Sequence, residues 1–395
     1  MIPEVRAKIE HIQLRSISEG YKKSKVGVIP DAWCCYQIHE CLSICNYERK
    51  PISEDVRKTI PGPYPYYGPT QAQGYIATYE SEGPAVLIGE DGDHFLKYKN
   101  QEMTMYVDGK YTVNNHAHVL RGTELCETKW FYYAYQHKSL FDAITRQGAG
   151  RYKLTKEALI KLSLQCPPIE EQKKIISILN TQDKVIKLKE KRLAEKQRQK
   201  KYLMQQLLTG KKRLPGFAFE VEKTNIKAIS TYSVSTISQT MLESYEGKQL
   251  YPVFNANSIA GHVDFYENEC PYISIIKDGA GIGRVRLCEA KSSTIGTMGC
   301  IHARKGISII FLYYLLEQVD FNKYSNGSTI PHLYYKDYSC EKVRIPDIKE
   351  QAAIAEVLST ADREIELLQQ DIEQEKQKKK ALMQLLLMGI VRVTV

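Results

Sequence analysis

The chain has 395 residues, 43% of them hydrophobic, so it is long enough for two or three domains that each bury a core. Lys and Arg number 55 against 46 Asp and Glu, and the resulting charge of +9 permits, without requiring, a polyanionic partner such as nucleic acid. Residues 1–19 have no long apolar core, and the longest apolar run, residues 307–316, is too short to span a bilayer. We therefore expect a soluble cytoplasmic protein with no membrane partner.

The first globular domain is predicted over residues 20–166, after an N-terminal segment (residues 1–19) whose role is unknown. Short β-branched and aromatic runs alternate there with Gly, Pro and Asn, which is typical of a largely β domain, and a helix is expected over residues 131–140. A second domain is predicted over residues 214–345, with a helix over residues 307–317. The two domains match at offsets near 187 and then 179 residues, as for Tyr64 with Tyr251 and Gly148 with Gly327. The two domains are therefore predicted to share one fold and to differ in the length of the loops in their middle parts.

Four of the ten cysteines, Cys34, Cys35, Cys41 and Cys45, lie close to His39 in the sequence. They form no CxxC pair, so the spacing is a weak signal for zinc and no metal site is predicted. In a reducing cytosol the other six are interpreted as small buried hydrophobic residues: Cys126, Cys166, Cys270, Cys288, Cys300 and Cys340.

Two helical repeats are predicted, over residues 167–213 and 346–395. Residues 167–213 match residues 346–392 without a gap at an offset of 179 residues, as for Gly210 and Gly389. Each begins after a proline, has acidic residues in its first turn and reaches a glycine at its end, which are the start and stop signals of a helix. About 40 residues at a rise of 1.5 Å make a rod of roughly 60 Å. The repeat is too long for a solenoid unit. The chain is thus predicted to be two copies of a domain followed by a long helix.

Apolar residues recur in both helices at alternating spacings of four and three, the pattern of a coiled-coil seam. One such helix would suggest a dimer, but two in one chain are expected to pair with each other. The predicted fold is α+β, with two pseudo-repeated mixed α/β domains separated by two long antiparallel coiled-coil helices. The apolar seam residues are Ile175, Leu179, Ile186, Leu193, Leu203, Leu207, Ile354, Leu358, Ile365, Leu368, Ile372, Leu382 and Leu386.

No catalytic residues are predicted. The glycine run at residues 278–283 is a weak match to a dinucleotide or S-adenosylmethionine loop, because no helix pattern follows it and its counterpart at residues 91–93 lacks the spaced glycines. The chain has no GxxxxGK[ST] phosphate loop and no HExxH motif, and the two copies share no carboxylate cluster. A non-catalytic binding protein is expected.

The helix starts PPIEEQKKIISILN and PDIKEQAAIAEVLSTAD, with GVIPDAW before the first domain and GKKRLPGF before the second, are similar to those of the DNA-specificity subunit of type I restriction-modification systems. The resemblance covers nearly the whole chain. It implies two target-recognition domains that each read one half of a bipartite, asymmetric double-stranded DNA site, and a helix pair that fixes the spacer. The stretch after Gly389 has no second KKRLPGF, and the missing piece resembles residues 22–30, so the pseudo-symmetry would be circular.

The resemblance also implies partners. Two methyltransferase subunits, which bind S-adenosylmethionine, would dock on the helices, and ATP-dependent restriction and translocase subunits would complete the complex. The chain itself would need no cofactor. Two other classes stay open: a coiled-coil scaffold or adaptor that binds no DNA, and a stand-alone nuclease or methyltransferase. A neighbouring gene for a methyltransferase would favour the specificity subunit.

Arg, Asn and Gln read base edges in the major groove, while Lys and backbone amides hold phosphates. Any single residue of this kind is more often a solvated surface group than a base contact. The candidates are Gln71, Gln73, Asn114, Asn115, Arg146, Gln147, Arg151 and Lys153 in the first domain, and Asn255, Asn257, Lys277, Arg284, Arg286, Lys323, Asn326 and Ser328 in the second.

Overall fold

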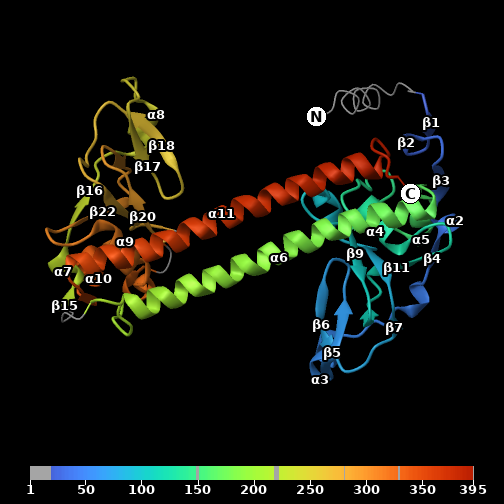
Figure 1. Cartoon of the computed structure of the whole chain (residues 1–395), viewed down its shortest axis with the longest axis horizontal. Helices are drawn as coiled ribbons and strands as arrows, with labels where there is room; N and C mark the ends of the chain where they lie inside the picture. Colours follow the sequence, from blue (N-terminus) through green and yellow to red (C-terminus); the bar gives the residue numbers. More distant parts are fainter. Residues whose placement is uncertain (1–18, 148–150, 218–221, 280, 328–329, 395) are drawn as a thin grey trace. The chain divides into compact units, whose positions relative to one another are not determined.

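The computed structural model describes residues 19–147, 151–217, 222–279, 281–327 and 330–394, and the N-terminal segment lies almost wholly outside this range. The chain divides into two compact units (Figure 1). One comprises residues 1–188 with 372–395, and the other comprises residues 189–371. Each unit therefore contains one globular domain together with part of each long helix. No helix in the described part of the chain is long and apolar enough to cross a membrane.

The domain of the first unit is built on an antiparallel sheet in the order β4-β11-β8-β9. A second sheet, β6-β5-β10-β7, contains one parallel pair, β5 with β10. The strands are β1 (Tyr21–Ser24), β2 (Gly27–Pro30), β3 (Cys34–Gln37), β4 (Leu42–Ile44), β5 (Pro61–Tyr67), β6 (Ala72–Ile76), β7 (Ser81–Glu82), β8 (Ala85–Gly89), β9 (Thr104–Val107), β10 (Lys110–Val113), β11 (Ala117–Gly122), β12 (Thr145–Gln147), β13 (Arg151–Lys153) and β14 (Ser163–Cys166). The short helices are α2 (Ile38–Cys41), α3 (Glu54–Thr59), α4 (Thr128–Tyr135) and α5 (Lys156–Lys161), with 3-10 turns η1 (Asn46–Glu48) and η2 (Asp93–Lys97).

The domain of the second unit repeats this frame. Its main sheet runs β16-β22-β19-β20 and a smaller one runs β18-β17-β21. The strands are β15 (Glu222–Asn225), β16 (Ser230–Val234), β17 (Tyr251–Phe254), β18 (Ile259–Val263), β19 (Tyr272–Ile276), β20 (Val285–Cys288), β21 (Ser293–Thr294), β22 (Met298–Ala303), β23 (Ser325–Asn326), β24 (His332–Leu333) and β25 (Lys342–Ile345). The short helices are α7 (Ile226–Ile229), α8 (Gln239–Glu243), α9 (Ile309–Glu317) and α10 (Tyr335–Tyr338), with the 3-10 turn η3 (Phe321–Tyr324).

One strand of each main sheet is buried along its whole length. These are β8, with the sequence AVLIG, and β19, with the sequence YISII. A strand covered on both faces carries an unbroken apolar run rather than an alternating one. Trp130 and Phe131 of α4 belong to the same core cluster as Val86 of β8, and Phe311 of α9 belongs to that of Ile273 of β19. The predicted helices at residues 131–140 and 307–317 are thus α4 and α9, and α4 begins and ends earlier than expected.

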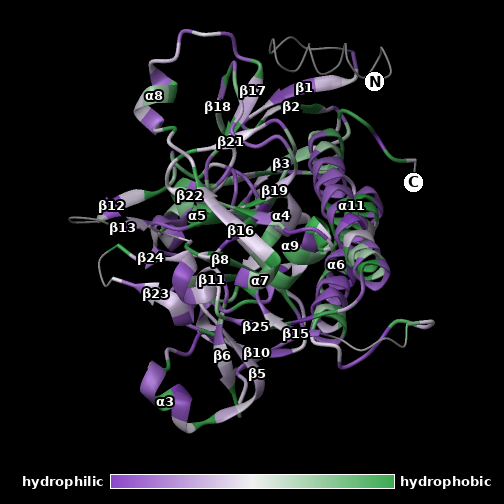
Figure 2. Cartoon of the chain, turned by 90° about the vertical axis from the view of Figure 1, so that its left-hand side faces the viewer, coloured by the Kyte–Doolittle hydropathy of each residue, from purple (hydrophilic) through white to green (hydrophobic). Residues whose placement is uncertain are grey.

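The long helices are α6 (Ile169–Leu207) and α11 (Ile348–Leu387), and hydrophilic residues predominate along both (Figure 2). Gly210 and Gly389, just beyond their ends, have φ angles of 69° and 67°, a left-handed conformation that glycine adopts without a Cβ penalty. The helices pack antiparallel, because salt bridges join rising positions of α6 to falling positions of α11. Within the second unit these are Lys189–Asp371 at 2.8 Å, Lys196–Glu364 at 2.6 Å and Lys200–Asp362 at 2.6 Å.

All of the predicted apolar seam positions are buried or half-buried. Toward the beginning of α6, Ile175 and Leu179 are fully buried in the core cluster of the first domain, together with Leu386 of α11. Ile354 and Leu358 enter the core cluster of the second domain in the same way. The terminal parts of the seam therefore belong to the domain cores, and the polar middle is closed by ion pairs.

Each domain is fastened to the helices by the same set of polar contacts. In the first unit the Tyr133 hydroxyl donates to Asp183 Oδ2 at 2.7 Å, and Lys379 pairs with Asp183 Oδ1 at 2.7 Å. In the second unit Tyr314 donates to Asp362 at 2.7 Å, and Lys200 pairs with that carboxylate. Burial is the main cause that raises the pKa of each of these tyrosines, so each hydroxyl stays protonated and donates.

Candidate nucleic-acid interface

A β-hairpin in the first domain is attached to the end of the buried strand β8. The hairpin pairs β12 with β13, and residues 148–150 between them lie outside the described residues. Beyond β8, the Glu90 carbonyl accepts from Leu154 N at 2.7 Å, and Gly92 N donates to the Tyr152 carbonyl at 3.0 Å. These backbone bonds connect the base of the hairpin to the most buried strand of the domain.

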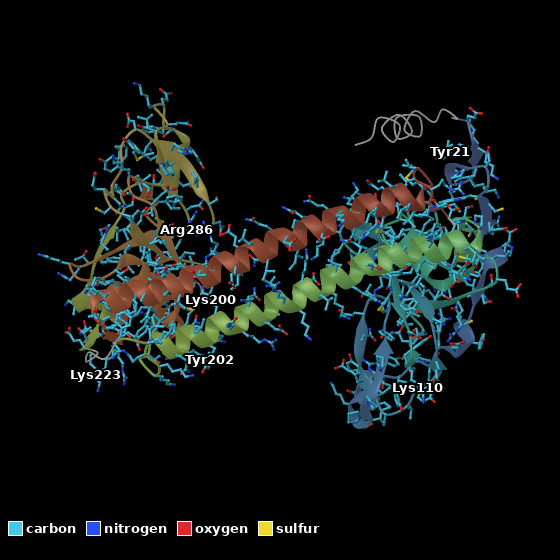
Figure 3. The ribbon with its side chains drawn as sticks, viewed as in Figure 1. Tyr21, Lys110, Lys200, Tyr202, Lys223 and Arg286 are labelled. Atoms are coloured by element: carbon cyan, nitrogen blue, oxygen red, sulfur yellow. The ribbon has the colours of Figure 1, made fainter. Side chains whose placement is uncertain are left out.

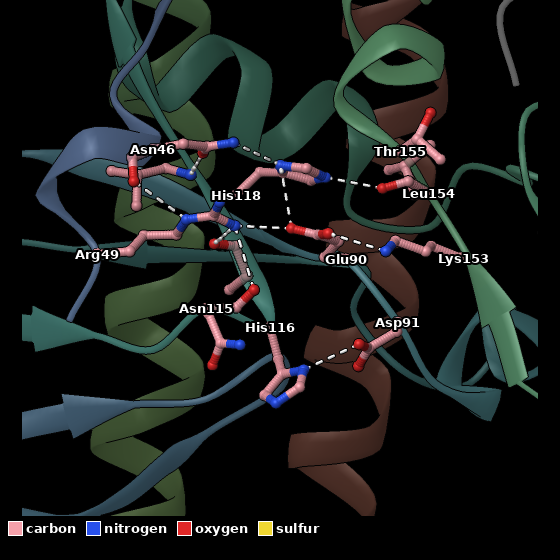
Figure 4. A network of polar contacts seen from close by, with 12 residues as sticks. Asn46, Arg49, Glu90, Asp91, Asn115, His116, His118, Lys153, Leu154 and Thr155 are labelled. Carbon is pink, nitrogen blue, oxygen red and sulfur yellow. Dashed lines mark hydrogen bonds and ion pairs between the residues drawn. The ribbon is translucent and has the colours of Figure 1, made fainter. Parts of the chain in front are cut away.

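Charged side chains reinforce the same junction (Figure 4). The Glu90 carboxylate receives Arg49 Nη1 at 2.6 Å and Lys153 Nζ at 3.5 Å. The ring of His118, which is 1% exposed, contacts the Leu154 carbonyl through Nε2 at 2.8 Å and Asn46 Nδ2 through Nδ1 at 2.9 Å. Burial lowers the pKa of His118, so the neutral ring is favoured. The buried neutral His118 and the Glu90 carboxylate, with its two ion pairs, thus hold the hairpin at the end of β8.

The second domain attaches a hairpin at the equivalent position with different side chains. Leu333 N donates to the Lys277 carbonyl at 2.8 Å, and Gly279 N donates to the Pro331 carbonyl at 2.9 Å. Asp278 pairs with Lys277 at 2.9 Å and with His332 at 2.7 Å. Burial opposes ionisation of Asp278, but these two hydrogen bonds lower its pKa overall. The backbone junction is thus conserved between the copies while the charges around it differ.

The hairpins present several of the residues predicted to contact DNA. Arg146 and Arg151 are exposed, and the Arg146 guanidinium lies 5.9 Å from the ring centroid of Tyr152. In the second domain Asn326 is exposed and donates to Asp337 Oδ2 at 3.2 Å, and Lys323 is exposed in η3. The side chain of Gln147 and the whole of Ser328 lie outside the described residues. Lys153 and Lys277 are half-buried in the junctions described above.

A second group of predicted residues borders the first hairpin. Gln71 and Gln73 are exposed around the turn between β5 and β6, and Asn115 is exposed after β10. Asn114 is 5% exposed, and its side chain donates to Gln73 at 3.2 Å and accepts from His116 N at 2.9 Å. The Asn114 side chain therefore joins two parts of this loop region and is nearly buried. His116 Nδ1 contacts Asp91 at 2.8 Å, which links this loop to the hairpin junction.

In the second domain the remaining predicted residues gather where β17 ends and β20 begins. Asn255 Oδ1 accepts hydrogen bonds from the backbone N–H groups of Asn257 and Ser258, which closes a turn. Arg284 donates to Asn257 Oδ1 at 2.8 Å and to the Ala256 carbonyl at 2.9 Å. Arg286 of β20 is exposed (Figure 3), with its guanidinium 4.6 Å from the centroid of the Phe254 ring. The structure therefore brings these four predicted residues into one neighbourhood.

The glycine run of the second domain is a loop between two strands. It connects β19 to β20, and Gly279, Gly281 and Gly283 have φ angles of 80–84°. Strand β20 begins two residues after Gly283, so the run does not open a helix, as a phosphate-binding turn would.

The cysteines are arranged differently from their order in the sequence. Cys41 lies beside Cys126 and Cys166, and the Sγ atoms of the three are within 4.8 Å of one another. Cys270 and Cys340 are exposed, so the interpretation of these two as buried hydrophobic residues was wrong, whereas Cys126, Cys166, Cys288 and Cys300 are buried as expected. Cys41, Cys126 and Cys166 are far apart in the sequence and meet only in the folded domain, so no sequence motif indicates the cluster. The Glu90 and His118 junction was missed for the same reason.

Comparison with known proteins gives a consistent result. The family model of the type I restriction modification DNA specificity domain matches residues 30–197 and again residues 219–377. A Haemophilus influenzae protein provisionally named as a type I restriction enzyme specificity subunit is 26% identical over 352 residues, which cover 81% of this chain and 85% of that protein. The type I restriction enzyme MjaVIII specificity subunit of Methanocaldococcus jannaschii is 23% identical over 422 residues, covering 95% of this chain and 96% of that protein.

Two solved structures share the fold. The S subunit of a type I restriction-modification system from M. genitalium superposes with a TM-score of 0.65 at 15% identity, covering 94% of this chain and 99% of that one. A chain from a structure described as showing complex assembly and conformational transition of the type I R-M system has a TM-score of 0.53 at 14% identity, covering 92% of this chain and 99% of that one.

Proposed function

We propose that in this chain, which belongs to the type I restriction-modification DNA specificity family, each globular domain reads its own half of a bipartite, asymmetric DNA site. One observation supports this division most directly: both domains attach a hairpin to the end of a buried strand through the same backbone bonds, but surround it with different side chains. Equivalent frames with unlike side chains suit two readers of two different sequences, because base edges are distinguished by side-chain chemistry.

The hairpin side chains supply the reading in this proposal. An arginine placed at a guanine edge makes two hydrogen bonds and discriminates by about 1–3 kcal/mol against the wrong base. Arg146 and Arg151 in the first domain, and Asn326 in the second, are exposed on β-hairpins. Ion pairs hold each hairpin where it joins the buried strand. Because the hairpin is already held in place, its backbone loses less conformational entropy on binding DNA.

The helix pair sets the length of the spacer in this proposal. Helix α6 has 39 residues and α11 has 40, so each is roughly 60 Å long at 1.5 Å per residue. Ion pairs such as Lys196–Glu364 fix the register of the two helices within a unit. A fixed rod length predicts a spacer of fixed length and free sequence.

The chain would provide specificity, and its partners would provide the chemistry. We propose that two methyltransferase subunits, carrying S-adenosylmethionine, dock on the outer faces of α6 and α11, and that ATP-dependent restriction subunits join them in the cytoplasm. The repeat gives two equivalent helix surfaces, which suits two copies of one partner. Purified alone, the chain should transfer no methyl group from S-adenosylmethionine to DNA.

A domain exchange tests the proposal. Strand β15 pairs with β25, so residues 222–345 begin and end side by side and can be exchanged as a unit for the equivalent domain of a relative. Expressed with its methyltransferase, the exchanged chain should methylate a motif with one new half, one unchanged half and an unchanged spacer, read by methylome sequencing. An exchange that rewrote both halves would refute the modular reading.

A further inference from the structure

Three buried cysteines meet in the core of the first unit. Cys41 ends α2, Cys126 lies in the loop before α4, and Cys166 ends β14. Their exposures are 0%, 0% and 2%, and their Sγ atoms all lie within 4.8 Å of one another. Three elements that are distant in sequence therefore converge on one thiol cluster.

The second unit shows which residues the same frame uses at these positions. Helix α7 ends at Ile229 as α2 ends at Cys41, and each is followed at once by the first strand of its main sheet. Strand β25 ends at Ile345 as β14 ends at Cys166, and a proline follows each. Two of the three cysteines thus correspond to isoleucines.

The third correspondence comes from two glutamines in the long helices. The side-chain amide of Gln172 bridges the two residues that flank Cys126, accepting from one backbone N–H at 2.9 Å and donating to the other carbonyl at 2.9 Å. Gln351 bridges the two residues that flank Ile307 in the same way, at 2.9 and 3.3 Å. Cys126 therefore corresponds to Ile307.

The frame does not require sulfur at any of the three positions. Ile229 and Ile345 are buried in the core cluster of the second unit, and Ile307 packs against that cluster. Isoleucine is larger than cysteine and apolar, so packing alone is satisfied by an aliphatic side chain there. The three thiols are a feature of the first domain only, which calls for a chemical rather than a packing explanation.

The geometry matches a metal centre. Three sulfur ligands at about 2.3 Å from one ion lie roughly 4 Å apart, within the separations of this cluster. The present thiol contacts are weak, with Cys41 Sγ 3.6 Å from the Gln37 carbonyl and Cys126 Sγ 3.6 Å from the Glu127 carbonyl.

We propose that Cys41, Cys126 and Cys166 bind one thiophilic d10 cation, Cu⁺ or Zn²⁺, through three thiolates. Each thiol gives up its proton to solvent as its sulfur–metal bond forms, and no oxidation or reduction is involved. In the part of the chain that the structure describes, no fourth His, Cys, Asp or Glu joins the group. Three-coordination suits Cu⁺, while Zn²⁺ leaves the smaller net charge in the core. The bound ion would join α2, the loop before α4 and β14.

The test uses the full-length chain with the two ions as probes. Chain purified anaerobically under reducing conditions is equilibrated with buffered Cu⁺ or with Zn²⁺, and bound metal is measured by mass spectrometry and X-ray absorption. We expect one ion per chain with three sulfur neighbours, and a higher melting temperature with the ion. The Cys126→Ala variant should lose the ion. The double variant Cys288→Ala/Cys300→Ala, which removes two buried thiols of the second unit, should keep it.

Three results would overturn the proposal: no ion at saturation, an ion retained equally by Cys126→Ala, or fewer than three sulfur neighbours in the unmodified chain. A disulfide between two of the three cysteines in the reduced, metal-exposed chain would do the same. If Cys126→Ala fails to fold, the sulfur count of the unmodified chain still decides the question. The Cys126→Ile variant, which copies the second domain, offers a filled-core alternative for the loss measurement.

Discussion

The guanidinium of Arg392 pairs with the buried carboxylate of Glu171 in the first turn of α6, with Nε 2.6 Å from Oε1 and Nη2 2.8 Å from Oε2. Trp33 Nε1 donates to the same carboxylate at 3.1 Å. In the second unit Arg213 pairs with Glu350 in the first turn of α11. Arg213 corresponds to Arg392, and Glu350 to Glu171, at the repeat offset of 179 residues. The segment after each long helix therefore secures the beginning of the other.

Replacing Arg392 by Ala should destabilise the first unit. Glu171 is 1% exposed, and without Arg392 its charge would keep, among the described side chains, only the bond from Trp33. The change should therefore cost about 2 kcal/mol or more. Glu171→Gln should cost less, because it removes the buried charge and leaves Arg392 able to reach water. Denaturant unfolding of the purified chain measures both changes.

The matched control for this pair is Lys173→Ala. Lys173 forms an exposed ion pair with Glu170 in the same turn of α6, and such pairs contribute about 0–1 kcal/mol. The double variant Arg392→Ala/Glu171→Gln should lose less than the sum of the two single changes, since the partners interact directly. Strict additivity would show that the pair is not coupled.

Replacing Arg146 or Arg151 by Ala should weaken recognition of one half-site only. Each change should cost about 1–3 kcal/mol if the guanidinium meets a base edge, and the loss should fall on DNA altered in that half. If the side chain meets a phosphate, affinity should fall for all sequences and the salt dependence should become shallower. Competition binding by the assembled complex, with DNA varied in one half at a time, separates these cases. Asn326→Ala in the second domain is the counterpart, and its effect should fall on the other half.

The stability of the first unit should fall as the pH drops below about 6.5. Val119 N donates to Asn46 Oδ1 at 3.0 Å, which turns the Asn46 amide group toward His118 Nδ1 as a donor. Nδ1 must then accept, and Nε2 holds the proton that the Leu154 carbonyl receives. Burial lowers the folded-state pKa of His118 below its unfolded value of about 6.5, so the unfolded chain binds the extra proton and is favoured as the pH falls.

His118→Asn should reduce this dependence on pH. Burial also lowers the pKa of His94, so part of the slope should remain in the variant. Unfolding free energies measured at several pH values between about 7.5 and 5.5 provide the comparison. An unchanged slope in His118→Asn would mean that another group carries the effect.

The long helices could be predicted from sequence because their signals are local and appear twice. The seam spacing, the prolines and the glycines all lie within residues 167–213 and 346–395, and α6 and α11 follow them closely. The exposure of the loop residues could not be predicted in this way. Asn114 looked like a base-reading amide but is buried against Gln73, and Lys277 is half-buried beside Asp278. Exposure depends on packing between distant segments, which no local pattern encodes.

The thiol cluster shows the same limit. Cys41 stands near Cys34, Cys35 and Cys45 in sequence, yet its neighbours in space come from positions 126 and 166. The pairing of β3 with β14 brings Cys166 close to the segment that contains Cys41. Strand pairing across more than a hundred residues is set by the whole domain, so the composition of the cluster could not be read from spacing.

Lengthening both helices together should lengthen the spacer and leave both half-sites unchanged. Lys189 pairs with Asp371 and Lys196 pairs with Glu364, so four residues inserted after Lys191 alone would displace one set of ion pairs against the other. A matching insertion after Gln370, the equivalent position of α11, should restore the register. The paired insertion adds about 6 Å, or roughly two base pairs at 3.4 Å each. Methylome sequencing should show the longer spacer for the double insertion and reduced methylation for either single insertion. An unchanged spacer in a well-folded double insertion would show that the helices do not measure the site.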